Sequence, residues 1–308
     1  MDNSVWRLIP LLSASGSVQM AIDQWLLEQH LAGEIPPTLR FYTWQPAAVS
    51  LGYHQRRWPE FWQELSWRGM PVELVRRPSG GRAVLHQGDL TYAVVASGFA
   101  SSRLKAYQTI CEFLIEGWRA MGLDLHYGEA GRGYIHNPNC FATATGADLV
   151  TLDGCKLIGS AQLRRGDAIL QHGSMRLQPD VSLFSQVFGE ELIPVQLPLS
   201  EGGDDLIATV VHVLSAAACR CFEIDLEVQP LSEEEWQAIA DVEGRRKKEN
   251  ILDTGLLEEV GYLANIANLK SENSSRAAPQ LERSALWQFR AISLNPASFP
   301  NQQLNLYH

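Results

Sequence analysis

The sequence predicts an α+β fold in which a mixed or mostly antiparallel sheet is flanked by helices. Short runs of strand-forming residues are grouped around isolated helical patterns, instead of alternating with them one by one. With 308 residues, of which 45% are hydrophobic and 19% charged, the chain can fill a sizeable core. The composition then changes after residue 244. These observations predict one α+β domain followed by a C-terminal appendage.

The first half of the chain contains two helical patterns and a series of short strand patterns. Residues 17–27 predict an amphipathic helix, because apolar side chains recur every three or four positions. A tryptophan-rich segment at 59–67 predicts a short helix, and 106–121 predicts a long one. Strands are predicted between these helices, at residues 39–44, 48–52, 72–76, 82–86 and 90–96.

The second half begins with a predicted β-meander. The Asp153-Gly154 and Arg165-Gly166-Asp167 turns are typical of hairpins, and they join strands predicted at 149–152, 156–164 and 168–171. Helices at 181–188 and 204–221, a strand at 222–228 and a helix at 233–243 follow. A basic run at 244–248 then precedes an amphipathic helical pattern at 250–270 and a polar segment at 271–280 with the composition of a disordered one.

Charge is distributed unevenly along the chain. The net charge is −10, yet the first 180 residues hold 16 basic and 16 acidic side chains, and the remainder holds nine and 19. The acidic balance argues against nucleic-acid binding, and no apolar run approaches the ~18 residues of a membrane span. No secretory signal is visible, and five cysteines do not form a disulfide framework. We expect a monomeric cytoplasmic protein with reduced thiols and no contact with a membrane.

A glycine-bearing loop between two predicted strands is the first candidate binding element. Pro78 stiffens its entry, and Gly80 and Gly81 allow positive φ angles and close approach of a ligand to the backbone. Arg77 supplies fixed positive charge suited to carboxylate or phosphate oxygens. Taken alone, the loop is more typical of an ordinary glycine turn flanked by solvated arginines, and His86 after it is more typical of a structural or surface histidine than of a catalytic one.

Cys140 and Lys156 are two further residues with reactive side chains. A neighbouring ammonium group favours the thiolate form of a cysteine. Lys156 is the only lysine between Lys105 and Lys247 in a chain with five lysines and twenty arginines, which points to a group that can lose its proton. In general a lone cysteine is more often a small buried hydrophobic residue.

Two sequence patterns together resemble a known family. The Arg-Arg-Pro-Ser-Gly-Gly-Arg-Ala-Val-Leu-His run at 76–86 is similar to the acyl-binding loop of the biotin/lipoate protein ligase superfamily. Pro-Asn-Cys-Phe at 138–141, Gly-Cys-Lys-Leu-Ile-Gly-Ser-Ala-Gln at 154–162 and Gln-His-Gly-Ser at 171–174 resemble its cysteine-dependent octanoyl transferases. The resemblance covers residues 30–230 and implies the catalytic domain of that superfamily there, with 231–308 as a helical, partly disordered appendage.

The resemblance implies an octanoyltransferase that acts in protein lipoylation. Cys140 would take an octanoyl group from acyl carrier protein as a thioester and pass it to a lysine of a lipoyl-domain protein such as the glycine-cleavage H protein. Lys156 would stabilise the thiolate and transfer protons. The residues expected to bind the acyl group are Arg77, Ser79, Gly80, Gly81, His86, Gly159, Ser160 and His172. Trp44, Leu51 or Tyr53 is expected to line the alkyl tunnel, and no metal or cofactor is expected.

Three alternatives remain open from the sequence. An ATP-dependent lipoate–protein ligase on the same fold would need ATP and magnesium but no cysteine, although Arg82 and Gln87 depart from the usual ligase pattern. A lipoyl-domain amidotransferase would use the same cysteine chemistry with another donor. A non-catalytic acyl-binding or scaffold protein would share the fold but would not transfer an acyl group.

The remaining cysteines and several arginines carry weaker expectations. Cys111 is expected in the core, Cys155 is expected to pack, and the pair Cys219 and Cys221 lacks a matching second pair for a metal. Acyl carrier and lipoyl proteins are typically acidic, so arginines are expected to dock them. The candidate docking arginines are Arg56, Arg57, Arg76, Arg77, Arg82, Arg164 and Arg165.

Overall fold

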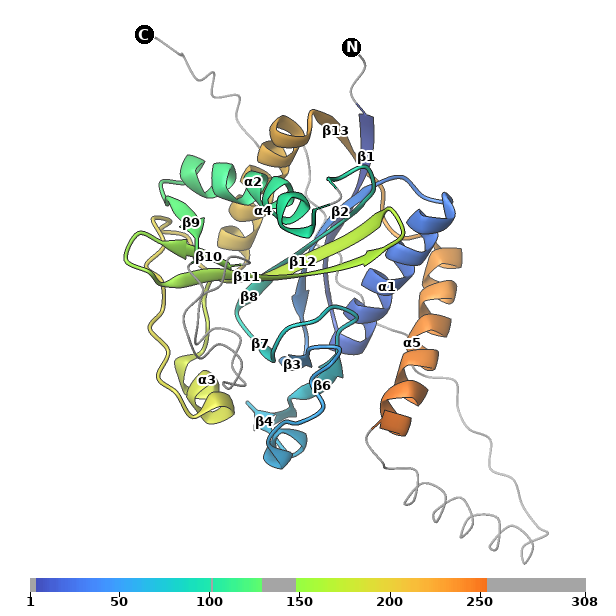
Figure 1. Cartoon of the computed structure of the whole chain (residues 1–308). Helices are drawn as coiled ribbons and strands as arrows, with labels where there is room; N and C mark the ends of the chain where they lie inside the picture. Colours follow the sequence, from blue (N-terminus) through green and yellow to red (C-terminus); the bar gives the residue numbers. More distant parts are fainter. Residues whose placement is uncertain (1–3, 101, 129–147, 254–308) are drawn as a thin grey trace, which may run out of the picture.

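The computed structural model describes residues 4–100, 102–128 and 148–253, and it confirms the α+β fold class (Figure 1). In this part of the chain an eight-stranded mixed sheet has the strand order β13-β1-β2-β8-β12-β11-β10-β9. β13 and β2 pair with β1 in parallel, and the other neighbours in the sheet are antiparallel. A smaller sheet has the order β6-β3-β7 and packs beside the main sheet.

The element bounds follow most of the sequence-based predictions. The strands of the main sheet are β1 (Ser4–Ala14), β2 (Thr38–Trp44), β8 (Asp89–Ala96), β9 (Leu125–Tyr127), β10 (Asp148–Thr151), β11 (Lys156–Arg165), β12 (Ala168–Arg176) and β13 (Ile224–Val228). The smaller sheet consists of β3 (Ala48–Leu51), β6 (Glu73–Arg76) and β7 (Val84–His86). The helices are α1 (Gly16–Ala32), α2 (Arg103–Ala120), α3 (Val181–Phe188), α4 (Gly203–Phe222) and α5 (Glu233–Asp253).

Helices cover both faces of the main sheet. Alternate side chains of β8 point to opposite faces, so Tyr92 and Val94 pack with α2 and α4 whereas Ala93 and Val95 pack with α1. Every residue of β8 is buried, as expected for a strand covered on both sides. A third apolar cluster joins the smaller sheet to α3, and there Trp62 Nε1 donates a hydrogen bond of 2.9 Å to the carbonyl of Val187.

The N-terminal strand β1 was not anticipated, although it lies inside the main sheet. Its apolar residues do not alternate, and Pro10 interrupts the pattern at the point where the pairing of β1 with β2 shifts register, between Ile9 and Leu12. Helix α1 follows directly, and Glu73 of β6 accepts hydrogen bonds from the first amide groups of this helix. Both elements therefore belong to the same folded unit as the predicted 30–230 span.

The predicted helix at 59–67 is wrong over most of its length. Only Glu60–Gln63 forms a single 3-10 turn, and Ser66–Trp67 (β4) pairs with Met70–Pro71 (β5) as a hairpin. Arg68 and Gly69 both adopt positive φ angles, of 49° and 77°, and these angles form a tight two-residue turn. The tryptophans in this segment pack against other elements instead of forming one helical face.

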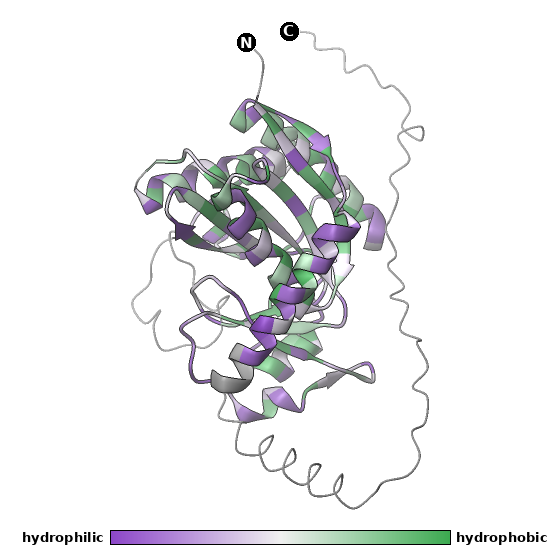
Figure 2. Cartoon of the chain, turned by 90° about the vertical axis from the view of Figure 1, so that its right-hand side faces the viewer, coloured by the Kyte–Doolittle hydropathy of each residue, from purple (hydrophilic) through white to green (hydrophobic). Residues whose placement is uncertain are grey.

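Helix α5 continues through the basic run at 244–248, where the composition of the sequence changes. It packs along α1, and Ile239 and Val242 are buried with the α1 core (Figure 2). Arg246 donates to the side chain of Gln24 and to the carbonyl of Arg76. The first part of the 231–308 appendage is thus helical and packed onto the catalytic unit, whereas residues 254–308 lie outside the described residues.

Among the described residues, α4 is long and apolar enough to cross a membrane. Core helices of globular proteins share these properties, and α4 packs its buried side on α2. The contact is close, since a Cβ added at Gly117 of α2 would lie 2.5 Å from the Leu214 side chain of α4. This packing identifies α4 as a core helix.

Candidate active site

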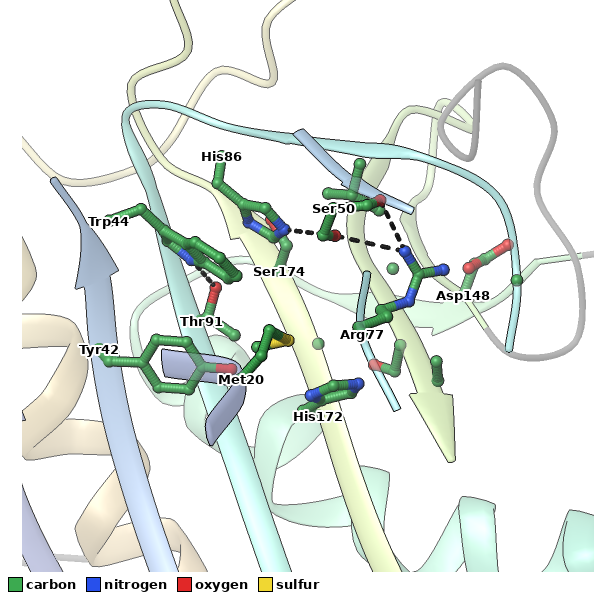
Figure 3. A pocket seen from close by; sticks show the side chains of 16 residues that line it. Met20, Tyr42, Trp44, Ser50, Arg77, His86, Thr91, Asp148, His172 and Ser174 are labelled. Atoms are coloured by element: carbon green, nitrogen blue, oxygen red, sulfur yellow. Dashed lines mark hydrogen bonds between the residues drawn. The ribbon is translucent and has the colours of Figure 1, made fainter. Parts of the chain in front are cut away.

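A pocket opens between α1, the main sheet and the smaller sheet, and it encloses about 580 Å³ of empty space including its mouth (Figure 3). Side chains from elements far apart in the sequence form its walls. The described lining residues are Met20, Tyr42, Trp44, Ser50, Arg77, Gly81, Val84, His86, Thr91, Asp148, Gly159, Ser160, Ala161, His172, Gly173 and Ser174. Six of the predicted acyl-binding residues therefore meet in one pocket.

His172 lies between a serine and a buried aspartate. Its Nε2 is 2.5 Å from Ser79 Oγ, and its Nδ1 is 2.7 Å from Asp23 Oδ2. Because the Asp23 carboxylate only accepts hydrogen bonds, Nδ1 of His172 is the donor in this contact. Ser79 is part of this chain of hydrogen bonds but does not line the pocket, and neither does Gly80.

The partner of His172, Asp23, is held inside a buried polar network. Arg40 Nη1 lies 3.2 Å from Asp23 Oδ1, Tyr42 donates to Oδ2 at 3.0 Å, and Arg40 also donates to Gln19. Burial lowers the pKa of Arg40, and Asp23 opposes this shift. Burial likewise raises the pKa of Tyr42 well above its usual value, so the phenol stays a neutral hydrogen-bond donor.

His86 lies in a second arrangement of the same kind. Its Nε2 is 2.8 Å from Ser50 Oγ and its Nδ1 is 2.8 Å from Asp89 Oδ2. The indole ring of Trp44 stacks on the imidazole, with 3.7 Å between ring centroids, and fixes its plane. Burial lowers the pKa of His86 despite the opposing effect of Asp89, so the imidazole is neutral at pH 7.

Arg77 fixes the conformation of the glycine loop through hydrogen bonds to backbone carbonyls. Its guanidinium group donates to the carbonyls of Ser50, Gly80 and Arg82, at 2.9, 2.8 and 2.7 Å. Gly81 has a φ of +97°, and a Cβ there would lie 2.7 Å from Arg77 Nη2. Gly80 does not have a positive φ angle, so only one of the two loop glycines needs the freedom that was expected of both.

Lys156 lies at the start of β11, beside the pocket wall. Its Nζ is 2.8 Å from Oδ1 of Asp148, and both side chains are almost fully buried, with exposures of 3% and 5%. Antiparallel pairing of β10 with β11 brings the two residues together. Asp148 lines the pocket, so a buried cation stands directly behind that part of the wall.

Gly159 and Ser160 lie in the strand segment that forms the floor of the pocket. The pairing with β12 places Gly159 opposite Ser174 and Ser160 opposite Gly173. Tyr92 donates to Ser160 Oγ at 2.9 Å. Gly173 admits no side chain, since a Cβ there would lie 2.4 Å from Ser160 Oγ, so the floor depends on this close contact.

The predicted nucleophile, Cys140, lies outside the described residues. The described cysteines are not activated thiols, because burial raises the pKa of Cys155, Cys219 and Cys221 and raises that of Cys111 to about 12. Cys111 is buried in the core as expected. No described group of three or more His, Cys, Asp or Glu side chains could hold a metal ion.

Of the three residues expected to line an alkyl tunnel, one lines this pocket. Trp44 does, whereas Leu51 packs in the third core cluster and Tyr53 is half exposed at the surface. Met20, Tyr42 and Val84 also contribute apolar surface to the pocket. They come from α1, β2 and β7, and their meeting depends on tertiary packing that the local sequence pattern does not reveal.

Sequence reasoning missed the two aspartates that orient the histidines. Asp89 stands three residues after His86 in a motif that was already identified, so this spacing was a usable signal. Asp23 is a lone carboxylate on the apolar face of α1, and a charge in such a place indicates a buried partner. Ser50 gave no local signal, because serine is common in short strands and loops.

Comparisons with known proteins agree with this architecture. The family described as lipoyl protein ligase A/B catalytic domain matches residues 15–196. The chain is 42% identical over 186 residues to octanoyltransferase LipM of Kyrpidia tusciae, covering 57% of this chain and 67% of the relative. It is 37% identical over 202 residues to octanoyltransferase LipM of Bacillus subtilis, covering 61% and 71% of the two chains.

Solved structures show the same fold. A lipoate-protein ligase A bound with ATP superposes with a TM-score of 0.66 at 24% identity, covering 83% of this chain and all of that one. A bipartite lipoate protein ligase from Thermoplasma acidophilum, described together with its E2 lipoyl domain, has a TM-score of 0.62 at 22% identity, covering 83% and 98%. The curated relatives confirm the prediction of an acyltransferase. The extent of the family match shows that this chain belongs to the lipoyl protein ligase A/B catalytic domain family.

Proposed function

We propose that this chain transfers an octanoyl group from octanoyl-acyl carrier protein, through a thioester on Cys140, to a lysine of a lipoyl-domain protein of the glycine-cleavage H type. The coarser activity, octanoyl transfer in protein lipoylation, rests on the relatives named octanoyltransferases and on the family match. The donor, the thioester and the acceptor are the finer parts of the proposal.

One structural observation carries the proposal: a buried ammonium group stands behind the pocket wall. Lys156 is held there by Asp148, which itself faces the pocket. A fixed cation near a thiol favours the thiolate, which is the form that attacks an acyl carbonyl.

The proposed reaction has two acyl transfers. The Cys140 thiolate attacks the thioester carbonyl, the bond to the carrier sulfur breaks, and the carrier leaves as a thiol with a proton from Lys156. The target lysine amine then attacks the octanoyl-Cys140 thioester and gives a proton back to Lys156, so that an amide bond forms, the bond to the cysteine sulfur breaks and the thiolate is released. The donor is already activated as a thioester, so no cofactor is needed, in line with the relatives named octanoyltransferases.

Intact-mass measurement with octanoyl-acyl carrier protein tests the nucleophile. The wild-type chain should gain one octanoyl group that neutral hydroxylamine removes, and the Cys140→Ala chain should gain no hydroxylamine-sensitive octanoyl group. Cys111→Ala, which removes an unactivated thiol from the core, is the matched control and should still be acylated. Transfer by Cys140→Ala at a near wild-type rate would contradict the mechanism.

The same assay separates the ligase alternative. Free lipoate with ATP and magnesium should give no product, whereas an adenylating ligase would be active and insensitive to thiol alkylation. The likeness to lipoate-protein ligase structures does not decide this, because at 22–24% identity it describes the fold alone.

The proposal includes a monomeric enzyme that acts in the cytoplasm.

A further inference from the structure

Ser50, His86 and Asp89 form a connected chain of side chains at the pocket wall. Figure 3 shows the Ser50–His86 part of it. Both links are 2.8 Å long, from the serine oxygen to Nε2 and from the aspartate oxygen to Nδ1. A nucleophile within hydrogen-bond reach of a base, with the base oriented by a third group, is the geometric signature of an activated serine. Ser50 Oγ and the His86 ring both line the pocket.

The protonation state of the Ser50–His86–Asp89 hydrogen-bond chain suits general base catalysis. The Asp89 carboxylate also accepts from Ser174 at 2.6 Å and from Thr91 at 3.2 Å, so it is held in place as an acceptor. His86 must then carry its proton on Nδ1, which leaves Nε2 free to accept the proton of Ser50. The pKa of His86 is lowered by burial, so the ring is in its basic form at neutral pH.

Arg77 places positive charge beside the serine oxygen. Its Nη1 lies 3.3 Å from Ser50 Oγ, and the guanidinium is fixed by the loop carbonyls described above. A fixed cation at this point stabilises negative charge that develops on the oxygen during attack. Arg77 also lines the pocket.

The similar chain through His172 differs in access. Ser50 and Ser79 are both 1% exposed, but Ser50 lines the pocket and Ser79 does not. Asp23, the aspartate of that chain, is also shared with Arg40 and Tyr42. The two chains therefore form an internal comparison, in which only one serine faces the space that an acyl group would occupy.

We propose that Ser50 is a second nucleophile of this pocket, which hydrolyses esters and thioesters of apolar acyl chains through an O-acyl ester. Ser50 Oγ bonds to the acyl carbon while its proton passes to His86 Nε2. The bond from carbon to the leaving oxygen or sulfur breaks, and the leaving group takes that proton. Water then attacks the ester through the same base, the bond to Oγ breaks, and the carboxylic acid leaves. This activity does not depend on Cys140.

The full chain carrying Cys140→Ala tests the proposal with p-nitrophenyl octanoate as the probe. We expect release of p-nitrophenol and one octanoyl adduct on the peptide that contains Ser50. The adduct should survive neutral hydroxylamine, which cleaves thioesters. His86→Gln in the same background should slow acylation by about 100-fold or more. Acylation should also fall on acidification, with a midpoint below the usual histidine pKa of about 6.5.

Two further variants make the result decisive. Ser66→Ala should keep the adduct, because Ser66 is exposed in the β4–β5 hairpin and does not line the pocket. Ser50→Cys preserves the shape of the site and should turn the adduct into one that hydroxylamine removes. An adduct on another residue, or hydrolysis by Ser50→Ala at the rate of its parent, would overturn the proposal. A hydroxylamine-sensitive adduct on Cys140 of the wild type tests the proposed function separately.

Discussion

At the scale of single residues, many polar groups line a pocket whose proposed substrate, an octanoyl chain, is apolar. Its two histidines are each hydrogen-bonded at both ring nitrogens, and Trp44 Nε1 donates to Thr91 at 2.9 Å. Polar groups that already have partners cost little when an alkyl chain replaces water beside them. The apolar character of this pocket therefore arises from internal pairing as much as from its hydrophobic side chains.

The Lys156–Asp148 pair makes a prediction that separates catalysis from stability. Lys156→Met should slow octanoyl-Cys140 formation by about 100-fold and should lower the free energy of unfolding by about 3–5 kcal/mol, because the buried Asp148 carboxylate loses this cation. Quenched intact-mass kinetics and urea denaturation measure the two effects.

Addition of Asp148→Asn to Lys156→Met is the control for that experiment. The double variant removes both buried charges, so the free energy of unfolding should recover while acylation stays slow. Recovery of both quantities together would mean that Lys156 acts only through folding.

His86 predicts an acid-sensitive stability. Its pKa is lowered in the folded state, so the unfolded chain binds the extra proton more readily as the pH falls below about 6.5. The stability that the neutral ring contributes is present above that pH and is lost on acidification. Urea denaturation at pH 7.5 and 5.5 should show a larger loss for the wild type than for His86→Gln. His126→Gln, at an exposed position of β9, should keep the wild-type difference.

At the scale of elements, the glycine loop can be tested with two neighbouring positions. Gly81→Ala should lower the free energy of unfolding by about 1–2 kcal/mol, because an L-residue is strained at a φ of +97° and its Cβ meets Arg77. Gly80→Ala is the matched control, since nothing lies within 4 Å of its Cβ, and its stability should change by less than about 0.5 kcal/mol. Thermal unfolding of both variants measures the difference, and equal destabilisation would contradict this account.

Most strands and helices could be predicted from local patterns, and the failures have physical causes. Strands β2 and β8 and helix α2 carry clear periodicity, and their bounds agree with prediction to within three residues. β1 failed because it is partly buried on both faces and contains Pro10, so its side chains do not alternate. Residues 59–67 failed because their aromatic spacing imitates a helix, while the turn at Arg68 and Gly69 selects a hairpin.

The site was predictable only where a motif spans it. The loop with His86, the lysine strand and His172 were identified from contiguous residues. Asp23 was not, because its contact with His172 joins residues 149 positions apart and depends on α1 crossing β12. Ser50 likewise becomes meaningful only when β3 pairs with β7, which places it beside His86. This part of the site therefore depends on contacts between segments that are distant in the sequence.

At the scale of the whole molecule, the acidic excess lies in a different part of the sequence from the residues of the candidate active site. The first 180 residues are neutral overall and the acidic excess follows them. Arg76 and Arg77 are buried and bonded to backbone carbonyls, so they are not available for docking. Among the docking candidates Arg56, Arg57 and Arg165 are exposed, and Arg164 is partly exposed and donates to the carbonyl of Ala100.

A charge-reversal pair tests whether this surface docks the carrier. Arg164→Glu with Arg165→Glu should raise the KM for octanoyl-acyl carrier protein several-fold with little change in kcat, and the effect should shrink as salt is added. Arg119→Glu with Arg220→Glu reverses two exposed arginines on α2 and α4 and should leave the KM near the wild-type value. An unchanged, salt-independent KM for the first pair would contradict docking at Arg164 and Arg165.

The position of β1 has a consequence for synthesis of the chain on the ribosome. β1 emerges before every other strand of the main sheet, yet one of its edges pairs with β13, where Ser4 lies opposite Ile224. Arg7 in the same strand is neutralised by Glu235 at 2.6 Å. Until more than two hundred further residues have been made, this edge and this charge have no native partner, and an open strand edge invites wrong pairing. A stalled nascent chain that ends before β13 should therefore engage chaperones more strongly than one that extends past α5.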